Sequence, residues 1–127
     1  MKLDRGTFDA APVSILSTRS VQTLEALLGS PLDLRRFRPN LVIEPTDGGD
    51  FPEDKWVGSR LRIGADVVVR VDQRDTRCAL INVDPETGDR DRSVLRAVAR
   101  HRANKLGAYG SVERRGVVAL GDAVYLT

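Results

Sequence analysis

The alternation of apolar and polar side chains predicts a chain built mainly from short β-strands. Residues 60–63 and 67–72 alternate polar and apolar positions on either side of a Gly-Ala-Asp tripeptide. Two alternating runs joined by a short glycine-containing turn are typical of a β-hairpin. Shorter apolar runs predict further strands at residues 11–17, 40–44, 55–57 and 79–83, and at least two within 108–126.

A helix is predicted directly after the first of these strands. Val21, Leu24, Leu27 and Leu28 recur at intervals that place them on one helical face. Gly29 suits the left-handed conformation that ends many helices, and a proline two residues later cannot extend the helix. The candidate N-caps, whose side-chain oxygens can accept from free backbone N–H groups, are Ser17, Thr18 and Ser20.

A second helix is predicted after a turn rich in Asp, Pro and Gly. Ser93 is the expected N-cap, and Leu95, Val98 and Ala99 are the expected buried face. His101 would then lie near the C-terminus of this helix. An exposed position there, where a charged imidazole complements the helix dipole, is favoured over a catalytic role.

Many short strands with two helices between them predict a mainly β protein of the α+β class, with a barrel-like sheet. The chain has 127 residues, of which 41% are hydrophobic and 30% charged, so residues 1–127 are expected to form a single domain. No apolar run approaches the roughly 18 residues needed to span a bilayer. The N-terminus lacks the apolar core of a secretory signal. A cytoplasmic location without a membrane partner is therefore expected.

Charge and residue counts narrow the function classes further. Lys and Arg number 20 and Asp and Glu number 18, giving a net charge of +2, so binding to bulk nucleic acid is not expected. A single cysteine excludes an internal disulfide and a zinc site built from several cysteines. A single histidine leaves little basis for a Ser-His-Asp triad or a multi-histidine metal site.

Cys78 is the first candidate for chemistry. An isolated cysteine is more often a small buried hydrophobe than a reactive group. Arg74 and Arg77 lie close in sequence, however, and positive charge favours the thiolate, the form that binds soft metals and attacks sulfur. If a strand already begins at this point, Arg77 and Cys78 point to opposite sides and the arginine acts indirectly. The sequence leaves both interpretations of Cys78 open.

Two polar segments could surround an anion. In the first, Pro39 favours an extended Arg38, so that Arg36, Arg38 and Asn40 direct several donors toward one point. In the second, residues 17–20, hydroxyl and backbone N–H groups at a helix N-terminus could do the same. Capping alone also explains those hydroxyls. A solvated arginine-rich surface is the competing explanation for the first segment.

Several short motifs, taken in order, resemble those of the MOSC domain family, the β-rich module that ends molybdenum-cofactor sulfurases and forms most of the amidoxime-reducing molybdoenzymes. The string RFRPN at residues 36–40 resembles one family signature, and Arg77-Cys78 with VDPETG at residues 83–88 resembles another. The other matching blocks are Glu53-Asp54 with Trp56, residues 62–64, Tyr109-Gly110 and residues 116–124. This ordered match implies the family's closed β-barrel with helices at its edges.

The resemblance also implies a site. In relatives that hold molybdenum cofactor, the cysteine of the second signature ligates the metal, and Cys78 occupies that position. The second arginine and the asparagine of RFRPN contact the cofactor, as do groups before the first helix. The family reduces N-hydroxylated substrates or handles sulfur for the cofactor. The predicted set is Cys78 as catalytic residue and metal ligand, with Ser17, Thr18, Arg19, Arg36, Arg38, Asn40 and Arg77 binding molybdenum cofactor (molybdopterin).

The chain departs from its longer relatives in the N-terminal portion, because it begins almost at the segment FDAAPV and lacks a stretch resembling their PVKS strand. Missing strands would leave an open barrel edge, which favours a homodimer that completes the barrel. The same shortening leaves it open whether the cofactor is retained or lost. Three functions remain: a molybdenum-dependent reductase served by an electron-transfer protein, a persulfide carrier or cofactor-binding module served by a sulfur-donor protein, and a structural module with an inert Cys78.

Overall fold

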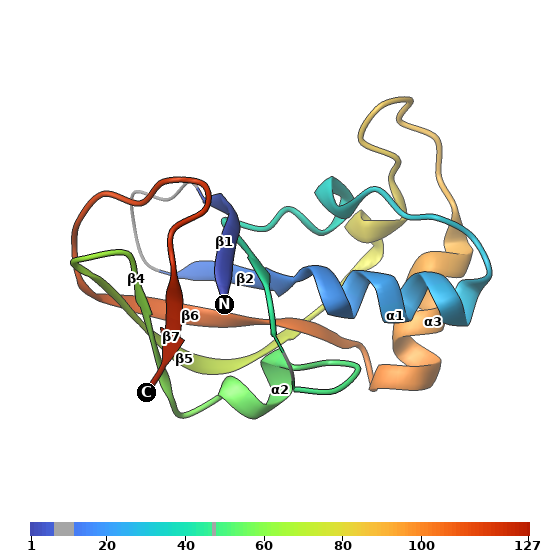
Figure 1. The fold of residues 1–127 in the computed structure, drawn as a ribbon. Helices are drawn as coiled ribbons and strands as arrows, with labels where there is room; N and C mark the ends of the chain where they lie inside the picture. The colour runs from blue at the N-terminus through green and yellow to red at the C-terminus, as the bar shows by residue number, and fades with distance from the viewer. Residues whose placement is uncertain (7–11, 47) are drawn as a thin grey trace.

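The computed structural model describes residues 1–6, 12–46 and 48–127, and the strands among them form one seven-stranded sheet. The order across the sheet is β1-β3-β2-β6-β5-β4-β7. Figure 1 shows this sheet curled on itself, with α1 and α3 together at one end. The predicted mainly β architecture is confirmed. The strands are β1 (Lys2–Gly6), β2 (Val13–Ser17), β3 (Leu41–Glu44), β4 (Arg60–Ile63), β5 (Val67–Thr76), β6 (Lys105–Arg114) and β7 (Val124–Leu126). The helices are α1 (Thr18–Leu28), α2 (Glu53–Trp56) and α3 (Arg92–Arg102), with 3-10 turns η1 (Leu34–Phe37) and η2 (Ala79–Asn82).

The two edge strands of this sheet meet and nearly close it into a barrel. The Leu3 N–H donates to the Asp122 carbonyl (2.8 Å), and the Val124 N–H donates to the Met1 carbonyl (2.7 Å). The Gly121 N–H donates to the Leu3 carbonyl in return (2.8 Å). The expectation of an open barrel edge is therefore wrong, because β1 covers the segment that leads into β7. A homodimer stays a prediction, but it no longer has an open edge as its basis.

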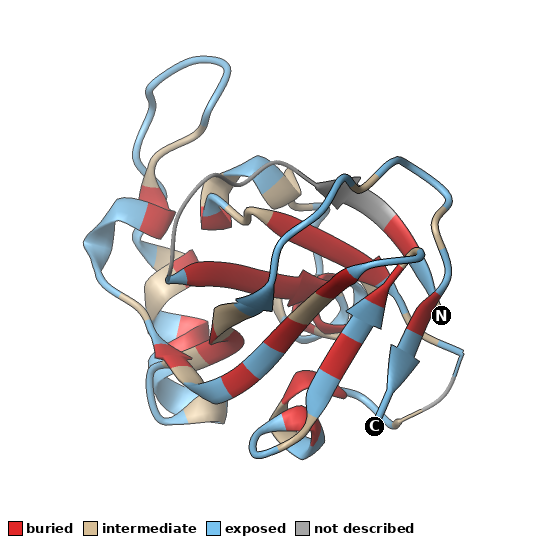
Figure 2. Ribbon diagram, turned by 90° about the vertical axis from the view of Figure 1, so that its left-hand side faces the viewer, coloured by how far each residue is buried: buried red, intermediate tan, exposed pale blue. Residues whose placement is uncertain are grey.

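Apolar side chains fill the barrel and also cover its outer face beneath the helices, and Figure 2 shows the resulting buried strands. In β2, Ile15 belongs to the barrel core with Leu61, whereas its neighbour Leu16 packs with Leu24 and Phe37 under α1. All five residues of β2 are buried. This strand is covered on both faces, so the side chains that point to either face of the sheet are buried. By contrast, β4 exposes every second residue and keeps the alternation seen in the sequence.

The first helix confirms its sequence prediction except at Leu27, which was placed on the apolar face but is 45% exposed. Ser17 caps α1 by accepting from the Ser20 N–H (3.0 Å), and the helix ends at Gly29 in the left-handed conformation (φ 78°). Val21 and Leu24 are buried in the predicted face. Residue 11, with which the preceding strand was predicted to begin, lies outside the described residues. Within the described part of the chain, no helix is long and apolar enough to cross a membrane.

The second long helix begins earlier than predicted. Asp91 caps α3 by accepting from the Ser93 N–H (2.9 Å), so Ser93 lies inside the helix and is not its cap. The buried residues of α3 are Val94, Ala97 and Val98. Ala99 is exposed, so its assignment to the buried face is wrong. His101 is exposed in the last turn, as predicted.

Two of the predicted strands are helical turns in the structure. Residues 55–57 belong to α2 and its C-cap, and Trp56 is buried in the barrel core. Residues 79–82 form η2, in which Ile81 is buried and Leu80 is exposed. A short apolar run does not distinguish a strand from a buried helical turn. The consequence for the site is that the chain turns sharply directly after Cys78.

Candidate functional site

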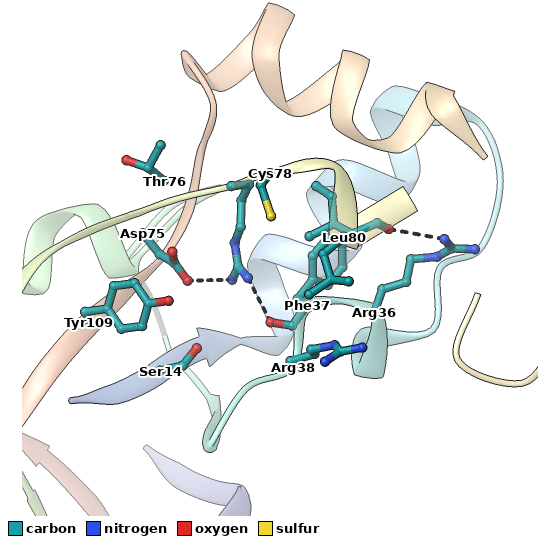
Figure 3. A pocket seen from close by; sticks show the side chains of 11 residues that line it. Ser14, Arg36, Phe37, Arg38, Asp75, Thr76, Cys78, Leu80 and Tyr109 are labelled. Atoms are coloured by element: carbon teal, nitrogen blue, oxygen red, sulfur yellow. Dashed lines mark hydrogen bonds and ion pairs between the residues drawn. The ribbon is translucent and has the colours of Figure 1, made fainter. Parts of the chain in front are cut away.

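A cavity of about 150 Å³ lies where the end of β5 meets η1, η2 and β6. Figure 3 shows Cys78, Arg38 and Tyr109 around it, each from a different segment of the chain. Ser14 of β2 and Asp75 of β5 form the inner part of its wall. This space is called the Cys78 cavity below.

Cys78 connects β5 to η2 in an extended conformation (φ −127°, ψ −178°). Its thiol is free and exposed, and it lies among the lining side chains in Figure 3. The interpretation of Cys78 as a small buried hydrophobe is therefore wrong. An accessible thiol can ligate a metal or carry sulfur, so both reactive roles remain available to it.

Arg77 turns inward and holds the Cys78 segment in place. Its Nε donates to the Leu106 carbonyl (2.9 Å) and its Nη1 to the Phe37 carbonyl (2.8 Å). Its Nη2 lies 3.1 Å from the Asp75 carboxylate, and the side chain is only 8% exposed. Burial lowers the pKa of Arg77, and the negative charge of Asp75 opposes that shift. The guanidinium therefore ties Cys78 to β6 and η1 through Nε and Nη1, and its Nη2 keeps no hydrogen-bond acceptor among the described residues.

Gly107 makes room for this guanidinium, and its replacement by alanine should destabilise the fold. Gly107 has a φ of 79°, and an added Cβ would lie 2.7 Å from the Ile15 carbonyl oxygen and 3.2 Å from Arg77 Nη2. Backbone strain and the clash together should cost about 2–4 kcal/mol, measurable by urea unfolding. Gly121→Ala, also at positive φ (87°) but with open space around the added Cβ, is the matched control and should cost about 1 kcal/mol. Equal losses would contradict the packing argument.

Both arginines of the RFRPN string line the cavity, but they differ in whether the guanidinium already has partners within the fold. Arg36 donates through Nη1 to the Ile81 carbonyl (3.2 Å), and its Nη2 lies 3.7 Å from the Asp84 carboxylate. Arg38 is exposed, and its guanidinium has no hydrogen bond or ion pair with the described residues. Arg38 is therefore the arginine of this cavity that is freest to bind an anion.

The backbone of Arg38 differs from the expectation. Arg38 has φ 52° and ψ 50°, in the left-handed region, so the predicted extended conformation is wrong. The residue is the C-cap of η1, and its N–H donates to the Arg35 carbonyl (3.1 Å), which overrides the preference that Pro39 imposes. A non-glycine residue in this region costs about 1–3 kcal/mol, and such residues cluster at functional sites.

Asn40 does not line the Cys78 cavity. Its Oδ1 accepts from the Ser14 N–H (2.7 Å), and its own N–H donates to the Ser14 carbonyl (3.0 Å). The Asn40 side chain therefore joins the start of β3 to β2, and its contribution to the site is to position the chain that carries Arg38.

The predicted group at the N-terminus of α1 also lies away from the cavity. Ser17 is buried, and both its N–H and its Oγ donate to the Glu53 carboxylate (2.9 and 2.5 Å). Glu53 thus supplies the negative charge that a helix N-terminus favours. Thr18 and Arg19 follow in the first turn. The structure therefore brings together Arg36, Arg38, Arg77 and Cys78, and leaves Ser17, Thr18, Arg19 and Asn40 outside this cavity.

Sequence reasoning missed Ser14, Asp75 and Tyr109, which also line the cavity. Asp75 did carry a weak signal, because it shares the odd-numbered positions of β5 with the buried residues 67, 69 and 71, although the exposed Gln73 and two register shifts interrupt the alternation. A carboxylate at an inward position of a strand is unusual, and Asp75 is only 2% exposed. Tyr109 lies in one of the blocks that resemble the family but carried no predicted role, and no comparable pattern marks Ser14.

A model of the MOSC domain family matches residues 4–125. The chain belongs to the MOSC domain family. The predicted family and its barrel fold are therefore confirmed. Two solved structures share the fold: YiiM from Geobacillus stearothermophilus (TM-score 0.64, 19% identity, covering 91% of this chain and 53% of that one) and the YUAD protein from Bacillus subtilis (TM-score 0.74, 18% identity, 94% and 65%). At these identities the likeness concerns the fold alone.

Relatives with a described activity are similar to this MOSC domain in sequence. Mitochondrial amidoxime-reducing component 1 of Mus musculus is 35% identical over 131 residues, covering 93% of this chain and 37% of the relative. Mitochondrial amidoxime reducing component 2 of Homo sapiens is 32% identical over 130 residues, covering 92% and 37%. The chain spans little more than a third of the length of these relatives.

Proposed function

We propose that this MOSC domain binds molybdenum cofactor at the Cys78 cavity and takes part in the two-electron reduction of N-hydroxylated compounds. The observation that carries the proposal is the free, exposed Cys78 thiol in one cavity with the unpaired guanidinium of Arg38. Family membership supports it, as do relatives whose names describe them as amidoxime-reducing components.

The chemistry of the lining residues suits a cofactor that carries both a soft metal and a phosphate. A cysteine thiolate is a soft anionic ligand, and guanidinium groups bind phosphate in a bidentate fashion. Ser14 Oγ is buried and has no hydrogen-bond partner among the described residues, so it is available to a ligand. The donor set therefore fits such a group.

In this proposal each lining residue has a separate task. Cys78 holds the metal, and Arg38 binds the phosphate with help from Arg36. Phe37 and Leu80 border the cavity and limit the access of water. When bound, the cofactor supplies a redox-active metal that can transfer two electrons. The electrons come from outside the chain, so an electron-transfer protein is the proposed partner.

Cofactor binding is tested with protein purified from a molybdate-supplemented host. Wild-type protein should contain molybdenum and pterin, whereas Arg38→Ala should lose both. A charge-assisted hydrogen bond contributes about 1.5–3 kcal/mol, or about 10- to 100-fold in affinity. Arg100→Ala, which removes an exposed arginine of α3, is the matched control and should retain both. Wild-type protein without molybdenum, before and after reconstitution, would count against the proposal.

The free thiol also favours a second function, because a sulfur carrier needs an accessible cysteine. Cys78 would then hold a persulfide received from a sulfur-donor protein. Intact-mass measurement distinguishes the two functions, since a persulfide adds about 32 Da and a reductant removes it. Purified protein that carries this adduct and no molybdenum favours the sulfur-carrier function. Protein that contains molybdenum and no adduct favours the reductase function.

A further inference from the structure

The inner wall of the Cys78 cavity carries polar atoms that the fold leaves without hydrogen-bond partners. Among the described residues these include Ser14 Oγ, Asp75 Oδ2 and Arg77 Nη2, all buried. Asp75 Oδ2 and Arg77 Nη2 lie 3.1 Å apart as an ion pair, but they are not aligned as a hydrogen bond. Buried polar atoms are nearly always paired, so this wall is suited to a polar ligand or to ordered water.

We propose that Asp75 donates a proton to the oxygen that leaves when a substrate's N–O bond is cleaved in the Cys78 cavity, and that Tyr109 returns a proton to Asp75 from solvent. The inference rests on the proposed reductase function. Its geometric basis is that both side chains line the same cavity as the thiol, with Asp75 beside Tyr109 in Figure 3 and 3.1 Å from Arg77 Nη2.

The reaction consumes two protons, and the proposed donor supplies one of them. Reduction of an N-hydroxyl group breaks the N–O bond, consumes two electrons and two protons, and releases the N–H product and one water. The electrons come from an electron-transfer protein or from a chemical reductant such as dithionite. One proton converts the departing hydroxyl into water, and the other is taken up by nitrogen. Asp75 supplies the first proton, solvent supplies the second, and the Asp75 carboxylate is then reprotonated.

Tyr109 provides the route for that reprotonation. Tyr109 and Thr76 line both the Cys78 cavity and a second cavity of about 510 Å³, so they form the wall between the two. Charged side chains, including Asp72 and Lys105, line the second cavity and favour its hydration. A phenol hydroxyl can accept a proton while donating one. Tyr109 can therefore pass a proton from this hydrated side to Asp75.

The electrostatics of the pair suit these roles. Burial raises the pKa of Asp75, while the charge of Arg77 and the nearby hydroxyl of Tyr109 lower it. Burial and the charge of Asp75 raise the pKa of Tyr109, so the phenol stays protonated. Arg77 and Tyr109 are the charged or titratable groups that act on Asp75 in the described structure. Because a raised pKa keeps the carboxyl protonated to higher pH, the rate should fall as pH rises through that pKa.

The test measures the single-turnover reduction of an aryl amidoxime by cofactor-loaded protein across a pH series. General acids contribute about 100- to 10,000-fold, so we expect Asp75→Asn to lose about 100-fold in the single-turnover rate. Tyr109→Phe should lose about 10-fold only in steady-state turnover with excess reductant, where Asp75 must be reprotonated after each cycle. The fall of the rate with rising pH should disappear in Asp75→Asn. Tyr125→Phe alters the other tyrosine, which is exposed on β7. It is the matched control and should keep the wild-type rate and profile.

A second readout uses cofactor-free protein and does not depend on the reaction. The ¹³C NMR signal of the Asp75 carboxyl, assigned by its absence from Asp75→Asn, should titrate above the value of about 3.9 for an unperturbed aspartate. It should titrate higher still in Tyr109→Phe, because the hydroxyl no longer stabilises the carboxylate. Titration near the unperturbed value would overturn the proposal.

The kinetic outcomes separate this inference from the function on which it rests. A wild-type rate and pH profile in Asp75→Asn would overturn the proton-donor role while leaving the reductase function intact. If Asp75→Asn does not fold, a wild-type steady-state rate in Tyr109→Phe overturns the proposed proton route through Tyr109 to Asp75. Wild-type protein that reduces no amidoxime at any pH would overturn both proposals together.

Discussion

Serine in place of Cys78 should remove molybdenum from the purified protein and abolish amidoxime reduction. Cys78 is the only cysteine of the chain, and its exposed thiol is the one soft donor among the residues that line the cavity. Serine is close to cysteine in size but offers a hard, uncharged oxygen. Replacing a residue that hydrogen-bonds to a metal ligand lowers the affinity for the metal about 10- to 100-fold. Loss of the ligand itself should therefore exceed about 100-fold.

Metal analysis and single-turnover reduction measure the two losses. The thermal unfolding of Cys78→Ser should match that of the wild type, because the Cys78 side chain is exposed. Ala79→Ser places a serine at the next exposed position without removing the thiol, so it is the matched control. Full molybdenum content in Cys78→Ser would contradict the ligand role and leave the family assignment unchanged.

Local sequence patterns are sufficient to predict most of the sheet and one helix. The β4–β5 hairpin follows from alternation, and α1 follows from the spacing of its apolar residues between Ser17 and Gly29. These signals are set by residues a few positions apart, so the remaining fold does not alter them. Part of the site is predictable for the same reason, because Arg38 and Cys78 lie in short strings that the barrel then brings together.

The rest of the site depends on partners far away in the chain. No residue close to Ser17 in the sequence indicates that the Ser17 hydroxyl and N–H both bond to Glu53, which lies 36 residues later. Likewise, the side-chain oxygen and the backbone N–H of Asn40 bond to Ser14, 26 residues earlier. A polar residue suited to bind a ligand is equally suited to join two strands. The tertiary structure shows which of these side chains already have partners within the fold. Of the residues predicted to bind the cofactor, Arg36, Arg38 and Arg77 line the cavity together with Cys78.

Alanine in place of Glu53 should destabilise the fold by about 3 kcal/mol. Glu53 is only 1% exposed, and its carboxylate accepts from the Ser17 N–H (2.9 Å), Ser17 Oγ (2.5 Å) and Ser20 Oγ (2.7 Å). Without it, each buried donor loses its acceptor at a cost of about 1–3 kcal/mol, and the two hydroxyls recover part of this by bonding to each other. The N-terminus of α1 also loses its negative charge.

Urea or thermal unfolding measures this loss, which should lower the Tm by about 10 °C for a chain of this size. Glu53→Gln keeps the shape and one acceptor oxygen and should lose less. Glu44→Ala, at an exposed position of β3, should stay within about 0.5 kcal/mol of the wild type. Equal stability of Glu53→Ala and Glu44→Ala would contradict the anchoring role.

The effect of Glu53→Ala should extend to the Cys78 cavity, although Glu53 does not line it. Leu24 of α1 packs in the same cluster as Phe37 of η1, and Phe37 directly precedes Arg38. Loosening α1 should therefore displace Arg38 and reduce molybdenum content in proportion to the loss of stability. Glu53→Gln should then fall between alanine and wild type in both measurements. A variant that loses molybdenum without losing stability would instead indicate direct contact between Glu53 and the cofactor.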